Sequence, residues 1–261
     1  MNKYKIFSKL KIISIFLFWI LVWQLIYIVV NKEIFIVSPL SVLKKLIEYL
    51  GYPEFYYSIL FSLVRIFSGF LLGAVIGILL AVTASASKLL YMLFSPVITI
   101  IKTIPAASII LLVFIWLKSA FIPTFISFLL VMPLFYVNTC EGISHTDEKL
   151  TEMAEIFGFS KLKKIKYIYI PSISPYFLTA FSSGVGLAWK SGVTAEILCS
   201  PSYSIGSNLK DAKTYLETTD IFLWTAVIII LSLLFEKLLL KIIEKAFPYI
   251  RRSNIETEKS K

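Results

Sequence analysis

The stretch Glu152-Met153-Ala154-Glu155-Ile156-Phe157-Gly158, followed by Ile168-Tyr169-Ile170-Pro171, lies in a charged, basic island between two long apolar segments. Its apolar residues before the glycine recur at helical spacing, at Leu150, Met153, Ala154 and Phe157. Gly158 stands where a helix would stop, because glycine enters the left-handed conformation without a Cβ penalty. Ser160 can cap a second short helix, which we expect Pro171 to end. The sequence therefore predicts an amphipathic helix-turn-helix elbow outside the membrane, suited to docking.

The spacing in this elbow is also that of a known motif. Its pattern is E-x-A, three residues, G, nine residues, then I-x-apolar-P, which places Glu152, Ala154, Gly158, Ile168 and Pro171 in register. The pattern resembles the EAA loop of binding-protein-dependent ABC transporter permeases. Residues 65–77, 95–107 and 184–196 resemble the nitrate/sulfonate/taurine type, so the likeness covers residues 38–247. Met153 and Ile170 depart from the usual alanine and leucine.

The resemblance implies a set of partners and a solute class. A cytoplasmic ABC ATPase would dock on the elbow through the five motif residues, and an extracytoplasmic solute-binding protein would deliver the solute. A second copy of the permease would complete the translocation path as a homodimer. The solute would be small, such as a sulfonate, nitrate or similar anion, and the sequence does not identify it.

Composition leads independently to an all-α polytopic membrane protein with about six transmembrane helices. The 261 residues are 58% hydrophobic and 16% charged, with a mean hydropathy of +0.84, too much apolar surface for a soluble domain of this length. In a soluble protein the net charge of +10 would suggest nucleic acid as a partner. Membrane proteins keep Lys and Arg in cytoplasmic segments, so we expect lipid and no nucleic acid. Cys140, Cys199 and His145 have no metal-binding spacing, and we expect no cofactor.

Apolar runs define the domain organisation. We expect a cytoplasmic N-terminus at residues 1–11, a permease domain at 12–252 with its coupling loop at about 141–171, and a polar cytoplasmic tail at 253–261. The predicted spans cover residues 12–30, 63–84, 94–117, 121–139, 174–196 and 221–240. About 17 Lys and Arg then fall in or beside cytoplasmic segments and about 7 in outer ones. This asymmetry predicts a protein of the cell membrane with both termini on the cytoplasmic side. Ser38 and Pro39 should begin an amphipathic surface helix, and residues 200–219 should form a polar outer loop.

Small residues mark helix faces for close packing. Gly69, Gly73 and Gly77 recur every four residues in the second span, and Gly184 belongs to a similar stripe in the fifth. Such stripes let another helix approach backbone to backbone, which lipid alone does not drive.

Charged residues within spans are candidates for the solute path. Lys102 and Pro105 interrupt the third span, where freed carbonyls at membrane depth require protein or water as partners. Lys102 could instead snorkel to the headgroups. Lys190 and Glu196 could line the path, or could be charges at a helix end that meet a partner on another helix. These alternatives remain open at this point.

The chain lacks a phosphate-binding G-x-x-x-x-G-K-[ST] loop, so energy for uphill transport must come from elsewhere, and the resemblance implies a separate ATPase subunit as its source. The alternative is an ion-coupled secondary transporter, for which Lys102, Lys190 and Glu196 would be coupling sites. No internal repeat supports that alternative. A membrane-embedded enzyme ranks third, because the sequence presents no nucleophile-base pair or paired catalytic carboxylates.

Overall fold

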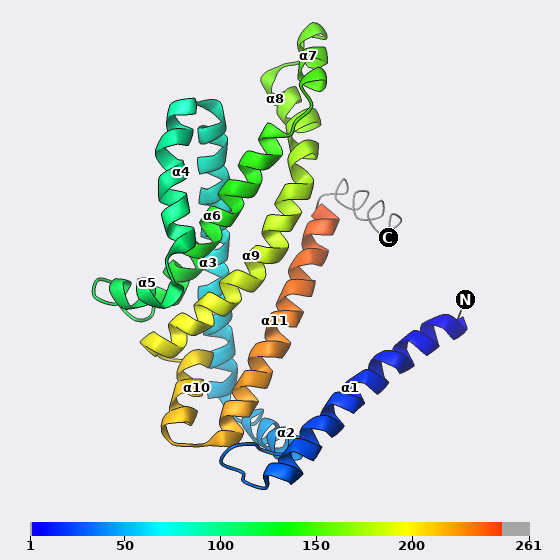
Figure 1. Ribbon diagram of the computed structural model, residues 1–261, viewed down its shortest axis with the longest axis vertical. Coiled ribbons are helices and arrows are strands. Elements are labelled where there is room, and N and C mark those ends of the chain that lie inside the picture. The colour runs from blue at the N-terminus through cyan, green and yellow to red at the C-terminus, as the bar shows by residue number, and fades with distance from the viewer. Residues whose placement is uncertain (1, 247–261) are drawn as a thin grey trace.

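The computed structural model describes residues 2–246, in which every regular element is a helix (Figure 1). The predicted tail at 253–261 lies outside the described residues. The elements are α1 (Asn2–Val30), α2 (Pro39–Tyr49), α3 (Pro53–Ala86), α4 (Lys88–Thr103), α5 (Ala106–Val113), α6 (Ile122–Ser144), α7 (Glu148–Ile156), α8 (Lys161–Lys164), the π-helical turn η1 (Ile165–Tyr169), α9 (Ile170–Cys199), α10 (Ile205–Thr214) and α11 (Thr218–Ala246).

Three described helices, α3, α6 and α11, are long and apolar enough to cross a membrane, and the pair α4–α5 is a fourth candidate span bent by 100°. The predicted break in the third span is therefore present. The remaining two predicted spans correspond to α1, whose apolar stretch is Leu17–Val30, and to the 30-residue α9. Neither meets the same length and hydropathy criterion within the described residues.

Helix α3 packs against α6 through its glycines. A Cβ atom built on these glycines would lie within 2.8 Å of backbone oxygens of α6, so the two backbones are in direct contact. The carbonyl oxygens that such a Cβ would meet are those of Thr124 at Gly69, Phe128 at Gly73 and Met132 at Gly77. On α9, Gly184 faces the rings of Phe70 and Phe135. The helices α3, α6 and α9 therefore form the centre of the bundle.

The junction between the elbow and α9 differs from the expectation. Pro171 does not end a helix but lies in the first turn of α9, and Ser174 and Pro175, at the expected start of the fifth span, lie inside α9. The helical path continues from α8 through η1 into α9. A proline ring clashes with the carbonyl four residues earlier in a regular α-helix, and the wider π turn accommodates it.

Two other boundaries also moved. The segment 200–219, expected as a polar loop, contains α10, whose first turn is capped by the Ser204 hydroxyl accepting a hydrogen bond from the Ser207 N–H at 3.0 Å. Ile205 and Ala212 bury the inner face of α10. At the other end of the bundle, α6 continues through Ser144 and so includes the first residues of the expected coupling loop. The predicted surface helix is present as α2, with Ser38 as its cap and Pro39 in its first turn.

Candidate functional site

The elbow formed by α7 and α8 projects beyond the bundle at one end of the molecule (Figure 1). The Asp147 carboxylate caps α7 by accepting a hydrogen bond from the Lys149 N–H at 2.9 Å. At its other end, the Phe159 N–H donates to the Ala154 carbonyl at 2.8 Å and the Gly158 N–H to the Glu155 carbonyl at 3.0 Å. Gly158 has a φ of +66°. These bonds form a Schellman motif, which satisfies the last carbonyls of the helix and reverses the chain.

An ion pair links the two limbs of the elbow. The Lys164 ammonium on α8 lies 2.8 Å from the Glu155 carboxylate on α7. Its hydrogen bond and positive charge lower the pKa of Glu155. The ion pair therefore adds to the free energy of unfolding at a pH above the unfolded-state pKa of Glu155. This contribution is lost as the pH falls through the lowered pKa of the folded state. Ser160 caps α8, accepting from the Lys163 N–H at 3.4 Å.

The five motif residues have different surroundings in the structure. Ala154 is fully buried and Ile168 is 6% exposed, so both can position the elbow but not contact a partner directly. Glu152 is exposed, Gly158 supplies the chain reversal, and Pro171 lies in the first turn of α9. The motif therefore contains two buried positions, one reversal, one helix start and one outward carboxylate.

Three apolar side chains of the elbow, which spacing in the sequence did not single out as contacts, are strongly exposed, and we call these three residues its apolar tip. Ile156 is 83% exposed, Phe157 71% and Leu162 79%. Along the second limb, the structure buries Ile168 but leaves Leu162 exposed. Because α8 has only four residues, helical periodicity could not assign its faces reliably.

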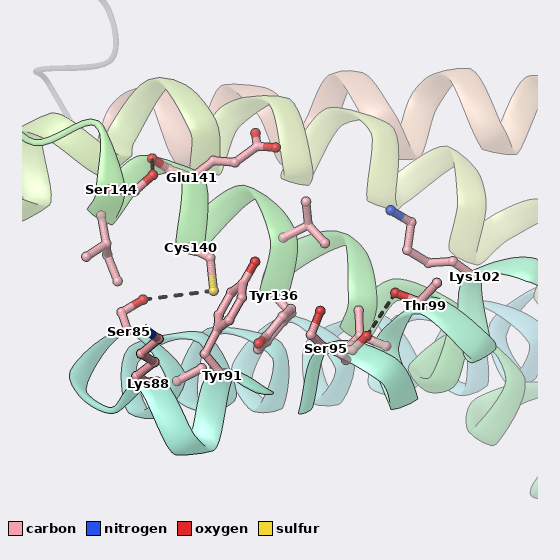
Figure 2. A pocket seen from close by; sticks show the side chains of 14 residues that line it. Ser85, Lys88, Tyr91, Ser95, Thr99, Lys102, Tyr136, Cys140, Glu141 and Ser144 are labelled. Atoms are coloured by element: carbon pink, nitrogen blue, oxygen red, sulfur yellow. Dashed lines mark hydrogen bonds between the residues drawn. The ribbon is translucent and has the colours of Figure 1, made fainter. Parts of the chain in front are cut away.

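The interrupted third span brings Lys102 to a groove. Ile104 and Pro105 are extended, with ψ of 131° each, and α5 departs after them. Lys102, in the last turn of α4, lines a groove of about 520 Å³ between α4 and the adjoining ends of α3 and α6 (Figure 2). Pro105 is exposed and is not one of the lining residues.

Glu196 instead belongs to a buried polar cluster that joins three elements. Its carboxylate is completely buried and accepts hydrogen bonds from the Ser62 hydroxyl at 2.8 Å and from the Gly206 N–H at 3.2 Å. The Arg65 guanidinium lies 3.6 Å away and also donates to the carbonyls of Ser202 and Tyr203. The cluster fastens α3 and α9 to the chain around the start of α10. A buried carboxylate with these partners fits the interpretation that the charge meets a partner on another helix.

The four candidate path residues are thus not brought together. Lys102 lines the groove, Pro105 makes the bend, and Glu196 is enclosed in its cluster. Lys190 is exposed on α9, with no ion pair inside residues 2–246 as described. The sequence analysis missed Arg65 as the partner of Glu196, because no local spacing connects residues on separate helices.

Comparison with known proteins identifies the family. Residues 73–247 match the model of the binding-protein-dependent transport system inner membrane component. SsuC of Bacillus subtilis (strain 168), a transport permease protein named for aliphatic sulfonates, is 27% identical over 207 residues, covering 78% of this chain and 74% of SsuC.

Two cyanobacterial relatives match shorter parts. The nitrate import permease protein NrtB of Synechococcus elongatus is 35% identical over 143 residues, covering 54% of this chain and 50% of NrtB. The bicarbonate transport system permease protein CmpB of the same organism is 26% identical over 163 residues, covering 62% of this chain and 59% of CmpB. With its helical spans, its elbow and a family match over most of its length, the chain belongs to the inner membrane components of binding-protein-dependent ABC transport systems, which are transport subunits and not enzymes.

Proposed function

We propose that this chain forms the translocation path of an ABC importer for a small anion, and that the α7–α8 elbow couples it to a separate cytoplasmic ATPase. The observation that carries the proposal is the apolar tip of the elbow. Ile156, Phe157 and Leu162 are exposed on a segment whose surrounding residues are charged. Several large apolar side chains exposed on one segment outside lipid are typical of a protein interaction site.

The elbow also has the rigidity that transmission of movement requires. The Schellman motif at Gly158 fixes the angle between its limbs, and the ion pair between Glu155 and Lys164 links them. Behind the elbow, the helical path passes through η1 directly into α9, which packs on α6 and α3. A displacement imposed on the tip can therefore reach the centre of the bundle through continuous helix.

The named relatives support the proposed solute class and the remaining partners. SsuC, NrtB and CmpB are named for aliphatic sulfonates, nitrate and bicarbonate, which are small anions. An extracytoplasmic binding protein would deliver such a solute to this chain, and a second copy of the chain would complete the path as a homodimer. The arrangement of α1 supports a larger assembly, because this helix diverges from the bundle in Figure 1 and leaves Leu17, Trp19 and Val29 exposed. Both termini would lie in the cytoplasm.

Substitution at the tip of the elbow tests the proposal. Leu162→Asp should greatly reduce co-purification of the ATPase with the permease, because it introduces a charge into the proposed contact. Tyr215→Asp is the matched control: Tyr215 is 75% exposed, after α10 at the opposite end of the bundle, and its substitution should leave co-purification unchanged. Full retention of the ATPase by a Leu162→Asp permease that inserts normally would exclude this surface as the docking site.

A further inference from the structure

The groove beside Lys102 is lined by polar side chains from three helices. It lies between α4 and the ends of α3 and α6 nearer the elbow (Figures 1 and 2). Its lining includes Lys88, Tyr91 and Lys102 of α4 and Tyr136, Cys140 and Glu141 of α6. Hydroxyl, thiol and charged groups predominate, which is unusual for a surface between helices that otherwise face lipid.

Helix α4 contributes one continuous polar face to this groove. Lys88, Tyr91, Ser95 and Lys102 are separated by three, four and seven residues, so they lie along one side of the helix. Figure 2 shows Lys88 and Lys102 at opposite ends, with the two tyrosines between them. The spacing is visible in the sequence but was obscured by the apolar residues on the other faces of the same span.

Tyr136 of α6 supplies the observation that points to a ligand. The residue is 3% exposed and lines the groove. Its hydroxyl lies near the Cys140 thiol but makes no hydrogen bond of normal geometry within the described part of the chain. Buried hydroxyls ordinarily have a partner. A buried donor without a partner, on a side chain that lines a cavity of this size, can serve a bound acceptor.

The charges of the groove favour an anion. Two ammonium groups, Lys88 and Lys102, face one carboxylate, Glu141, and none of the three forms an ion pair with the residues that the structure describes. The remaining titratable groups lining the groove are the phenols of Tyr91 and Tyr136 and the Cys140 thiol. The lining therefore carries a net charge of one positive unit, together with hydroxyl donors.

From this arrangement we propose that the groove is a binding site for a small oxyanion, centred on the Tyr136 hydroxyl. Lys88 and Lys102 attract the anion from either end, and the hydroxyls of Tyr136, Tyr91 and Ser95 donate hydrogen bonds to its oxygens. The inference rests on the proposed function, because the site would serve as a station for the transported solute at the elbow end of the bundle. An anionic lipid headgroup offers the same oxygen chemistry, so the test separates the two sources.

Cys140 provides a built-in reporter of occupancy. It lines the groove and is partly exposed, whereas Cys199, the other cysteine of the sequence, is buried elsewhere. In a Cys199→Ser background, the full-length permease in detergent is labelled with the neutral reagent N-ethylmaleimide, with sodium nitrate or an equal concentration of sodium chloride. If the occupied site does not react, nitrate at ten times its Kd should slow labelling about tenfold.

Matched variants decide whether that protection comes from the proposed site. Tyr136→Phe removes only the hydroxyl and Lys102→Gln only the charge, and each should abolish most of the protection relative to its own rate in chloride. Tyr215→Phe and Lys118→Gln, at exposed positions outside the groove, should retain it. Equal protection in all four variants, or no saturable protection in the parent, would overturn the site.

A third arm identifies the source of the ligand. If added phosphatidylglycerol protects Cys140 and nitrate does not, the groove holds a lipid headgroup and the proposal for a solute is wrong. The labelling uses the permease without its ATPase, so its outcome does not depend on the elbow. Retained docking in Leu162→Asp with intact nitrate protection would overturn the docking proposal alone, whereas loss of docking without nitrate protection in the parent would overturn the groove alone.

Discussion

At the scale of single residues, Gly158 is the position where backbone conformation and proposed coupling meet. Its φ of +66° is in the left-handed region, and a Cβ atom there would meet nothing within 4 Å. A side chain at this position would therefore act through backbone strain alone, which amounts to about 1–3 kcal/mol. A substitution at Gly158 therefore tests backbone strain without steric crowding.

Gly158→Val should weaken coupling by disturbing the angle of the elbow, because a β-branched residue is strongly disfavoured at positive φ. We expect less co-purified ATPase and a lower solute-stimulated rate of ATP hydrolysis in liposomes, with normal insertion of the spans. Gly158→Asn is the conservative comparison, since asparagine tolerates the left-handed conformation. Val and Asn variants that behave like the parent in both assays would contradict a coupling role for this reversal.

Glu196 presents the opposite case, a charge whose contacts are all inside the protein. Glu196→Ala would leave Arg65 without its carboxylate and the Gly206 N–H without an acceptor. Removing one partner of a buried ion pair destabilises a protein by about 3–5 kcal/mol, and we expect the lower end because Arg65 keeps two carbonyl acceptors. The midpoint of thermal unfolding in detergent measures this loss.

Glu196→Gln separates a structural role from a role in the solute path. The amide oxygen can still accept from Ser62 and Gly206, so the loss of stability should be smaller than for alanine. Transport should then follow stability. A glutamine variant that unfolds at the parental temperature but transports far less solute would indicate that Glu196 acts in the solute path.

At the scale of elements, the contact between α3 and α6 sets how closely the central helices approach. Gly77→Ala places a methyl group 2.5 Å from the Met132 carbonyl oxygen, so one of the two helices must shift. Overpacking of this kind costs about 1–3 kcal/mol, and the thermal midpoint should fall. Gly186→Ala on α9 is the matched control, because a Cβ there meets nothing within 4 Å. In that control, the higher helix propensity of alanine should leave stability equal or raised. A higher midpoint for Gly77→Ala would contradict the close contact.

The elements that could be predicted from the sequence are those specified by local chemistry. The Ser38 cap, the reversal at Gly158 and the break before Pro105 each depend on a residue whose backbone preference is strong by itself. The position of Pro171 inside a continuous helical path could not be predicted, because a π turn relieves the clash that normally ends a helix. The helix α10 was missed because its short inner face, around Ile205 and Ala212, is apolar only where tertiary packing requires it.

The candidate site likewise has features that local sequence predicts and features that arise only from packing. The elbow could be located from spacing, since its motif is contiguous. The pairing of Arg65 with Glu196 could not, because the two residues are brought together only when α3 packs on α9. The unpartnered hydroxyl of Tyr136 is likewise a property of packing, and a tyrosine in an apolar run gives no indication of it.

At the scale of the whole molecule, the helices that lie outside the predicted spans are at opposite ends of the bundle. The elbow and the neighbouring ends of α3, α4 and α6 form one end, and α2 and α10 form the other (Figure 1). The distribution of Lys and Arg assigns the elbow end to the cytoplasm by the positive-inside rule. The orientation is inferred from this charge asymmetry and not from the fold, because the same fold could cross the membrane with either end facing the cytoplasm.

Labelling of single cysteines from outside the cell tests that orientation. In a background without cysteines, Lys44→Cys on α2 and Tyr215→Cys after α10 should react with an impermeant thiol reagent, whereas Lys163→Cys on α8 should react only after the membrane is permeabilised. All three positions are exposed, so accessibility in the folded chain does not distinguish them and only the membrane can. Lys44 and Tyr215 also form no ion pair in the described structure, which limits disturbance of either helix. Labelling of Lys163→Cys in intact cells, with protection of the other two, would invert the topology. The elbow would then face away from any cytoplasmic ATPase, and the proposed coupling would be excluded together with the orientation.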